Sequence, residues 1–433
     1  MTVTITTKPH EKPQTNGDVK RDHAAQVDGA QIRPTYDEGV NPVLETSKWA
    51  VEAIGLARPN EDGIRSAAKY IHAQMQRESY APRTWRTHPL HICPAEPFSW
   101  KDPSTHACLN WIFLISSLNF SFWSELEGQH GRYGVEWREG WDSDRMVVHT
   151  GYWSLVAAID RALEDGIPIT DPAFYASETR CPDSLIEHVF RPAAQSTEGI
   201  PLLHERVRVL REVGVILCSD FGGSFCGFIE AFRRRYEDRG SALQLVKMVA
   251  DTFPSFRDEH MYDRRRVYIW KRTQILVAEA WAAFYPEHAS HPHPLFPAGA
   301  RIHELTMFAD YRVPQILHHL RILSYPPSLV KLLNTRTPLA SGSPEELSIR
   351  AASIVAVERV RREILRIVAD ARRSGVDGGG EEDVDEAEDA VSSVVIDFYL
   401  WDLAKRVEGR PDGVEGIESA GMLPIHRTRS IWY

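Results

Sequence analysis

The spacing of apolar residues restricts the fold of this chain more than any other feature, because they recur every three or four positions along much of it. In the segment WSLVAAIDRALE, for example, Leu155, Ile159 and Ala162 follow this spacing. Residues spaced in this way share one face of an α-helix and can pack against a core. The same pattern predicts helices over residues 43–57, 64–75, 153–164, 202–217, 242–253, 273–284, 313–323 and 350–369.

Strand patterns are few by comparison. Residues 132–137 and 146–150 flank the turn-rich segment WREGWDSD, and we interpret the pair as one short β-hairpin. The regular alternation of strand and helix that builds a doubly wound parallel sheet is absent. The sequence therefore predicts a mostly α fold with a small β-hairpin.

Composition along the chain predicts one domain with a tail and inserts. Residues 1–40 are polar, with few large apolar groups, which is typical of a disordered tail. Residues 41–433 are expected to form a single helical domain, since 43% of the whole chain is hydrophobic and this is ample for a sizeable core. Stretches rich in Pro and His, or in Gly and acidic residues, predict flexible inserts near residues 286–298, 372–390 and 408–421.

The charge of the chain restricts its partners. The formal net charge is −10, whereas a protein that grips a nucleic-acid polymer by its phosphates usually has a basic balance. The first residues lack the apolar stretch of a signal peptide. The longest apolar stretch, residues 109–123, is too short and too polar to span a membrane. We therefore expect neither a nucleic-acid polymer nor a membrane as partner.

Cysteine and histidine patterns do not predict a disulfide framework or a metal site. The five cysteines are widely spaced without a CxxC motif, which favours reduced thiols in a cytoplasmic protein, with the nucleus as an alternative location. The densest histidines are His318–His319, whose rings would point about 100° apart on a helix, and the loop pair His291 and His293. These spacings are unlike those of zinc sites. Phosphate-loop, dinucleotide-binding and metalloprotease motifs are also absent, so no cofactor is expected.

Two aromatic segments are candidates for binding a flat ligand. The segment LNFSFWS places Asn119 beside Phe120 and Trp123, and the segment GYWS places Tyr152 and Trp153 at the start of a predicted helix. Aromatic faces with neighbouring amide and hydroxyl groups can stack on a nucleobase and bond its edge. Taken alone, the first segment is more typical of an aromatic core strip, so both interpretations remain open.

Two charged residues lie in unusual positions. Asp310 follows the apolar segment TMFA and precedes a predicted helix that has Pro314 in its first turn. Free N–H groups at a helix start, together with the helix dipole, favour an ionised carboxylate there, although a simple helix cap is the commoner role. Lys271 enters an apolar helix, where it can extend to solvent, anchor a phosphate or pair with a buried carboxylate.

Seven segments together resemble the queuosine salvage protein family. They are LNFSFWS, GYWS, GIPIT, FGGSF, YIWKRTQIL, MFADYRVPQ and IDFYLWD, in this order between about residue 41 and Tyr433. The resemblance implies a fold similar to the helix-hairpin-helix DNA glycosylases, although the LPGxG-like hairpin of DNA-binding relatives is not evident. It also implies a free nucleotide as substrate, in agreement with the acidic balance.

The resemblance implies that queuosine 5′-phosphate is hydrolysed to queuine and ribose 5-phosphate, and that a separate transglycosylase reinserts queuine into tRNA. Matching the family's motifs, Asp310 and Lys271 are the expected catalytic residues, with no metal. The residues expected to bind substrate are Asn119, Phe120, Trp123, Tyr152, Trp153, Arg312, Asp397, Tyr399 and Asp402.

Several mechanistic and functional alternatives remain at this point. Asp310 can stabilise an oxocarbenium-like ribose, position water or attack directly. Lys271 can hold Asp310 ionised, bind the 5′-phosphate or do both. The rival functions are a base-excision DNA glycosylase, a non-catalytic carrier of queuine or its nucleotide, and a helical scaffold.

Overall fold

The computed structural model describes residues 39–433, except 289–290, 374–387 and 409–412. The chain divides into two units, Met1–Tyr36 and Asp37–Tyr433, and every described residue lies in the second. The predicted tail therefore lies almost wholly outside the described residues, as do the middle of the acidic insert and parts of the other two inserts.

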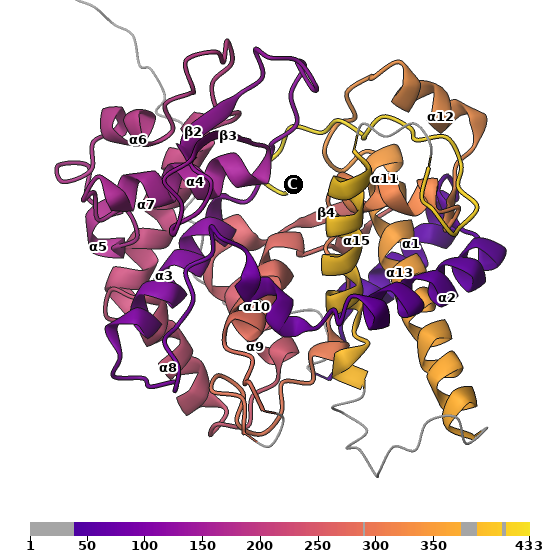
Figure 1. Cartoon of the computed structure of the whole chain (residues 1–433), viewed down its shortest axis with the longest axis horizontal. Helices are drawn as coiled ribbons and strands as arrows, with labels where there is room; N and C mark the ends of the chain where they lie inside the picture. The colour runs from indigo at the N-terminus through magenta and orange to yellow at the C-terminus, as the bar shows by residue number, and fades with distance from the viewer. Residues whose placement is uncertain (1–38, 289–290, 374–387, 409–412) are drawn as a thin grey trace, which may run out of the picture. The chain divides into compact units, whose positions relative to one another are not determined.

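Two N-terminal helices pack against a long helix from the other end of the chain. Helices α1 (Pro42–Ile54) and α2 (Glu61–Arg77) lie beside α13 (Pro344–Arg373) (Figure 1). The Asn41 side chain accepts from the Val43 backbone N–H and caps the start of α1, while Gly55 adopts the left-handed conformation that ends it. Local capping thus fixes both ends of the helix that α13 covers.

A second group of helices packs around the pair α3 and α10. Helix α3 (Pro103–Leu118) packs against α10 (Lys271–Ala283), and every residue of α10 is buried. A helix that is buried on all sides belongs to the middle of a protein. The helices around this pair are α4 (Tyr152–Glu164), α7 (Leu203–Asp220), α8 (Phe225–Arg235) and α9 (Ala242–Thr252).

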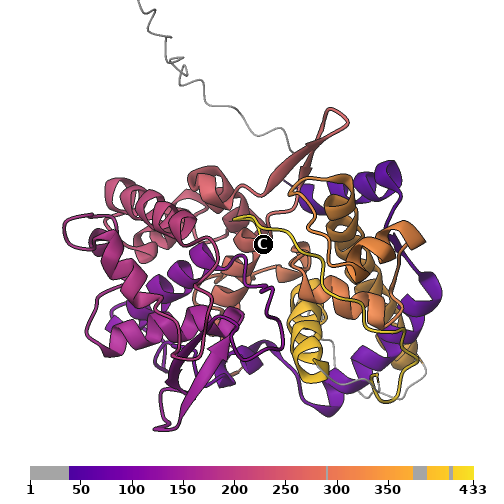
Figure 2. The same ribbon diagram turned by 90° about the horizontal axis from the view of Figure 1, so that it is seen from above.

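The remaining helices include two that reach the site described below. Helix α11 (Arg312–His319) packs against α15 (Ser393–Val407), and both contact α13. The C-terminal segment, yellow in Figure 2, runs back among the helices, and the backbone oxygen of Tyr433 accepts from the Ser121 N–H at 2.6 Å. The shorter elements are α5 (Pro172–Tyr175), α6 (Asp183–Val189), α12 (Pro327–Asn334) and the 3₁₀ turns η1 (Pro82–Thr87), η2 (Pro254–Phe256) and η3 (Ile302–Glu304).

The described residues also form three small antiparallel sheets of two strands. The predicted hairpin is confirmed as β2 (Gly134–Arg138) and β3 (Met146–Thr150), in which Glu136 lies opposite Val148. The sequence predicted only this hairpin, whereas the structure contains a second hairpin and a further strand pair. A second forms from β4 (Glu259–Tyr262) and β5 (Arg265–Tyr268), and β1 (Arg58–Pro59) pairs with the distant β6 (Leu323–Ser324). The strands of these two sheets are only two to four residues long, too short for an alternating pattern to reveal.

The mostly helical prediction is confirmed. All eight predicted helices are present, with ends that differ by a few residues, and α10 begins two residues earlier than its pattern predicts, so that Lys271 is its first residue. The FGGSF segment ends α7 and restarts the chain as α8. Helices α3 and α15 were not predicted, because their buried faces are too broad to leave a clear three-and-four spacing. Among the described residues no single helix is long and apolar enough to cross a membrane, and only the bent pair α7–α8 passes on length and composition.

Candidate active site

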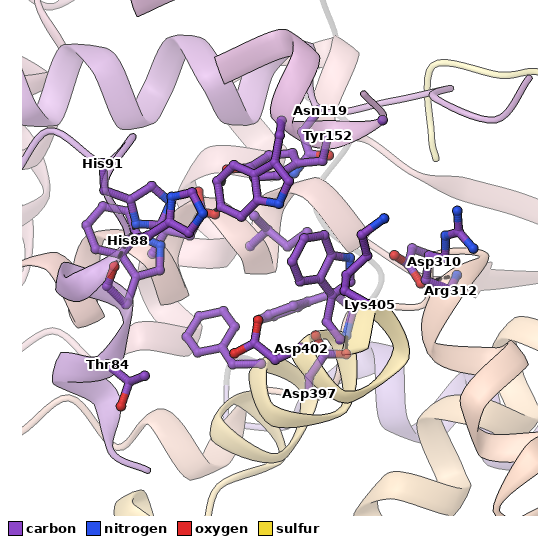
Figure 3. Close-up of a pocket in the computed structure, with 18 of the residues that line it drawn as sticks. Thr84, His88, His91, Asn119, Tyr152, Asp310, Arg312, Asp397, Asp402 and Lys405 are labelled. Carbon is purple, nitrogen blue, oxygen red and sulfur yellow. Dashed lines mark hydrogen bonds between the residues drawn. The ribbon is translucent and has the colours of Figure 1, made fainter. Parts of the chain in front are cut away.

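A pocket of about 300 Å³ lies where α10, α11 and α15 meet η1 and the loop that follows α3. Figure 3 shows His88 and His91 on one side of the pocket and Asp310 and Arg312 on the other, with Asp397, Asp402 and Lys405 carried by α15. The lining residues are Tyr80, Ala81, Thr84, Trp85, Thr87, His88, Pro89, His91, Asn119, Phe122, Arg132, Gly151, Tyr152, Trp153, Lys271, Ile275, Glu279, Phe308, Asp310, Tyr311, Arg312, Asp397, Phe398, Trp401, Asp402 and Lys405.

Asp310 sits at the amino end of α11 and opens to the pocket. Its Oδ1 accepts from the backbone N–H groups of Arg312 and Val313, both at 2.8 Å. Removal from bulk water raises the pKa of Asp310, and the nearby Lys271 and the two N–H groups oppose this effect only in part. The helix start supports the charged form as the sequence predicts, but the loss of hydration has the larger influence on the carboxyl.

Lys271 approaches the same region from the first position of α10. Its Nζ donates to the backbone oxygen of Asn119 at 3.2 Å and to Asn119 Oδ1 at 3.4 Å. The side chain is buried, and burial lowers the pKa of Lys271 to about 8, although the charge of Asp310 acts in the opposite direction. At neutral pH the ammonium therefore remains largely charged but can release its proton readily.

A buried ion pair joins the two chain segments that carry Asp310 and Lys271. Arg350 of α13 binds Asp258 through two contacts of 3.1 and 2.6 Å, and its Nε donates to the backbone oxygen of Ala309 at 2.9 Å. Asp258 Oδ2 in turn accepts from the Lys271 backbone N–H at 3.4 Å. Arg350 thus holds the residue before Asp310 and, through Asp258, the start of α10.

Two further acids of the pocket lie on α15. Asp397 accepts from the Phe308 N–H at 3.0 Å, and Asp402 accepts from the Tyr80 hydroxyl at 2.7 Å. Burial raises the pKa of both carboxyls, and the negative charge of Asp310 raises that of Asp397 further. Two close carboxyls that compete for ionisation favour one charged and one protonated partner, which here are Asp310 and Asp397.

Glu279 is a pocket acid that the sequence analysis missed. It lies two helical turns after Lys271, and Lys271, Ile275 and Glu279 line the pocket from one face of α10. Its carboxylate accepts from the Tyr152 hydroxyl at 3.3 Å and from Ser116 Oγ at 3.4 Å. Burial raises the pKa of Glu279 to about 7. The signal for it was the spacing of eight between Lys271 and Glu279, which places both charged residues near one face of a helix.

The end of the pocket away from Asp310 is aromatic. His88 stacks on Trp153 with ring centroids 3.6 Å apart, and Trp401 meets Trp153 edge-on at 5.7 Å. Burial lowers the pKa of His88 to about 4 and that of His91 to about 3, so both rings are neutral at pH 7. These histidines were not predicted, because no spacing pattern relates them to GYWS. Neutral stacked rings suit a flat base.

The structure brings most of the predicted site residues to this pocket. Eight of them line it: Asn119, Tyr152, Trp153, Lys271, Asp310, Arg312, Asp397 and Asp402. Further residues that the sequence analysis missed come from distant segments: Tyr80, Trp85, Arg132, Trp401 and Lys405. Trp401 belongs to the segment IDFYLWD but was not singled out there, and the other four carry no local motif, since only the fold places them next to the predicted residues.

Three predicted substrate-binding residues do not line the pocket. Phe120 is fully buried beneath the Arg206 guanidinium, which lies 4.4 Å from its ring centre. Trp123 donates its indole N–H to the backbone oxygen of Thr428 at 2.8 Å and faces the C-terminal segment. Tyr399 is buried edge-on to Tyr80. In the first segment Asn119 and Phe122 face the pocket instead, so part of LNFSFWS is the core strip that its composition also allowed.

Metal binding has no support among the residues that the structure describes, where no three of the His, Cys, Asp and Glu side chains come together as ligands. The five cysteines are free thiols. The pocket is lined by carboxyls, cations and aromatic rings.

The fold and the pocket together define a mostly helical protein with a ligand pocket whose wall contains a carboxylate and an ammonium, each at the start of a helix. A family model described as queuosine salvage protein matches residues 99–433. The chain belongs to the queuosine salvage protein family.

Curated relatives are similar to this chain over nearly its whole length. A protein of Schizosaccharomyces pombe is 37% identical over 90% of this chain and 99% of its own length. A mouse protein is 36% identical over 90% of this chain and 98% of its own, and one of Sphaerobacter thermophilus is 35% identical over 90% and 97%. All three are named queuosine 5′-phosphate N-glycosylase/hydrolase.

Proposed function

We propose that this chain hydrolyses the N-glycosidic bond of queuosine 5′-phosphate and releases queuine and ribose 5-phosphate. The observation that carries the proposal is the placement of Asp310, a carboxylate held by two backbone N–H groups at the wall of a pocket that also contains Lys271. The relatives with this activity in their names cover about 90% of the chain, which supports the same reaction here.

Asp310 is proposed to act on the ribose. Cleavage of an N-glycosidic bond builds positive charge on the sugar ring, and a fixed carboxylate beside the ring stabilises that charge. Lys271 helps to keep Asp310 ionised, because its positive charge lowers the pKa of the carboxyl. Its own pKa of about 8 leaves it protonated for this role at neutral pH.

Glu279 is proposed to act on the base. The departing base gains negative charge and must receive a proton before it leaves as a neutral molecule. A carboxyl with a pKa of about 7 holds a proton in about half of the molecules at pH 7, which suits a general acid. The aromatic rings of Tyr152, Trp153 and His88 would stack on the base and exclude water around it.

The fold supports one finer inference. We infer a resemblance to the helix-hairpin-helix DNA glycosylases, because the described body is mainly helical and its site acid lies at a helix start. Superposition of an experimental structure on such enzymes tests this inference.

The reaction is tested by incubating the purified chain with queuosine 5′-phosphate and separating the products by chromatography. We expect free queuine and ribose 5-phosphate in equal amounts. Thermal stabilisation by queuine without any release would favour the carrier function instead. Tight, salt-sensitive binding of duplex DNA with base release would favour a DNA glycosylase, which the net charge of −10 makes the less suited alternative.

A further inference from the structure

One wall of the pocket carries three cationic side chains from distant parts of the chain. Arg132 precedes β2, Arg312 is the first residue of α11, and Lys405 lies near the end of α15. Their side chains are only 10%, 11% and 29% exposed. Like charges held together with little hydration are costly, which points to an anion that they share.

Among the described residues, two carboxylates supply part of that negative charge. Glu127 Oε1 lies 3.0 Å from Arg132 and 2.7 Å from Arg312, and Glu408 lies 2.6 Å from both Arg312 and Lys405. Two carboxylates against three cations leave one positive charge in the cluster. Neither carboxylate is among the residues that line the pocket, whereas all three cations are. The cations therefore face the cavity and the carboxylates hold them from the other side.

The three cations also act on one another. Burial lowers the pKa of Lys405, and the charges of Arg312 and Arg132 lower it further. Burial would raise the pKa of Glu408, yet Arg312, Lys405 and Arg132 together lower it. Several cations that lie close together bind a ligand with several negative oxygens more strongly than they bind a single carboxylate.

We propose that Arg132, Arg312 and Lys405 form the binding site for the 5′-phosphate of the substrate, an assignment that rests on the proposed function. A phosphate monoester carries nearly two negative charges and three acceptor oxygens, which matches three converging cations. The backbone N–H of Arg312 donates to the Asp310 carboxylate. A phosphate bound at the guanidinium of the same residue therefore places the ribose close to that carboxylate. The base then extends towards the aromatic side of the pocket (Figure 3).

Lys271 is the other candidate for the phosphate, and its contacts favour a different role. Its ammonium already donates to two oxygens of Asn119 and is 4% exposed. It is also the cation that most lowers the pKa of Asp310. We therefore assign Lys271 to the sugar carboxylate and the cluster of Arg132, Arg312 and Lys405 to the phosphate.

The test compares queuosine 5′-phosphate with queuosine, which lacks the phosphate, for the wild type and for Lys405→Met and Arg132→Met. We expect each substitution to lower kcat/KM for the nucleotide roughly 10- to 100-fold, because a charge-assisted hydrogen bond is lost. For the nucleoside we expect a change of less than about threefold. Arg138→Met is the matched control, since Arg138 is 37% exposed and lies outside the pocket.

An equal loss for both substrates, or no loss for the nucleotide, would overturn the phosphate site while leaving the proposed function intact. Release of queuine from neither substrate by the wild type would instead overturn the proposed function. Calorimetry with ribose 5-phosphate tests the site even then: binding to the wild type that is weakened at least tenfold in both variants supports it, and equal binding to all three proteins overturns it.

Discussion

Asp258 and Asp310 are two carboxylates that are withdrawn from bulk water near Arg350. Their surroundings shift their pKa values in opposite directions. Burial would raise the pKa of Asp258, but the Arg350 guanidinium and His260 lower it to about 2. Asp310 forms no such ion pair with the residues that the structure describes. It receives two backbone N–H groups, feels Lys271 at a distance and keeps a raised pKa.

The difference separates a carboxylate that holds the structure from one that is free to react. The oxygens of Asp258 bind Arg350, His260 and the Lys271 backbone N–H, and Asp258 is 1% exposed. Asp310 opens to the pocket with one oxygen available to a ligand. A carboxylate with a raised pKa beside a cation in a cleft is a candidate for catalysis, whereas a fully paired one stabilises the fold.

The largest expected effect follows from breaking the structural pair. Asp258→Ala leaves the buried Arg350 with Glu346 as its remaining ion-pair partner, so we expect the free energy of unfolding to fall by about 3–5 kcal/mol. Chemical denaturation at pH 7 measures this, with the exposed Asp144→Ala as control. The folded pKa of Asp258 lies below its unfolded value, so its contribution is complete above about pH 4 and is lost as the pH falls towards 2. A loss under about 1 kcal/mol at pH 7 would contradict the structural role.

Removing Lys271, the cation that most lowers the pKa of Asp310, is expected to reduce turnover. Lys271→Met should reduce queuine release on the order of 100- to 1000-fold, because Asp310 then ionises less readily and the preorganised charge is lost. Lys271→Arg should recover part of the activity, since it keeps the charge. The exposed Lys331→Met, on α12, is a matched control and should release queuine at the wild-type rate. Wild-type turnover in Lys271→Met would remove Lys271 from the site chemistry.

The pH dependence of turnover tests Glu279 and Lys271, two groups that share the pocket with Asp310. We expect kcat/KM to fall above pH 7 as Glu279 loses its proton, and more steeply above pH 8 as Lys271 does, because both groups act in the protonated form. Glu279→Gln should lower the rate and leave only the fall near pH 8. A profile of Glu279→Gln that is parallel to the wild type would mean that Glu279 does not supply the proton.

The smallest effect is expected from removing the N-terminal unit. Deleting residues 1–36, the first of the two units, should change turnover by less than about twofold, because the described residues that line the pocket all belong to the second unit. A large loss would show that this segment acts at the site.

Much of the fold and of the site was predictable because the signal is local. Three-and-four spacing identified eight helices, and the position of Asp310 before a proline-containing helix indicated its backbone partners. What remained hidden depends on tertiary contacts. The direction of each side chain in LNFSFWS was not visible, because Ser121 adopts a positive φ of 54° in the middle of the segment. Arg132 and Lys405 meet Arg312 only through the fold, and Asp258 showed no pattern that would pair it with Arg350.

The most direct measurement compares Asp310→Asn with the wild type for both queuine release and unfolding. Asparagine keeps the side-chain oxygen that caps α11, so we expect the free energy of unfolding to change by less than about 1 kcal/mol. Turnover should fall on the order of 100- to 1000-fold, because the negative charge beside the ribose is lost. A variant that is as stable as the wild type and retains more than about a tenth of its activity would contradict the catalytic role of Asp310.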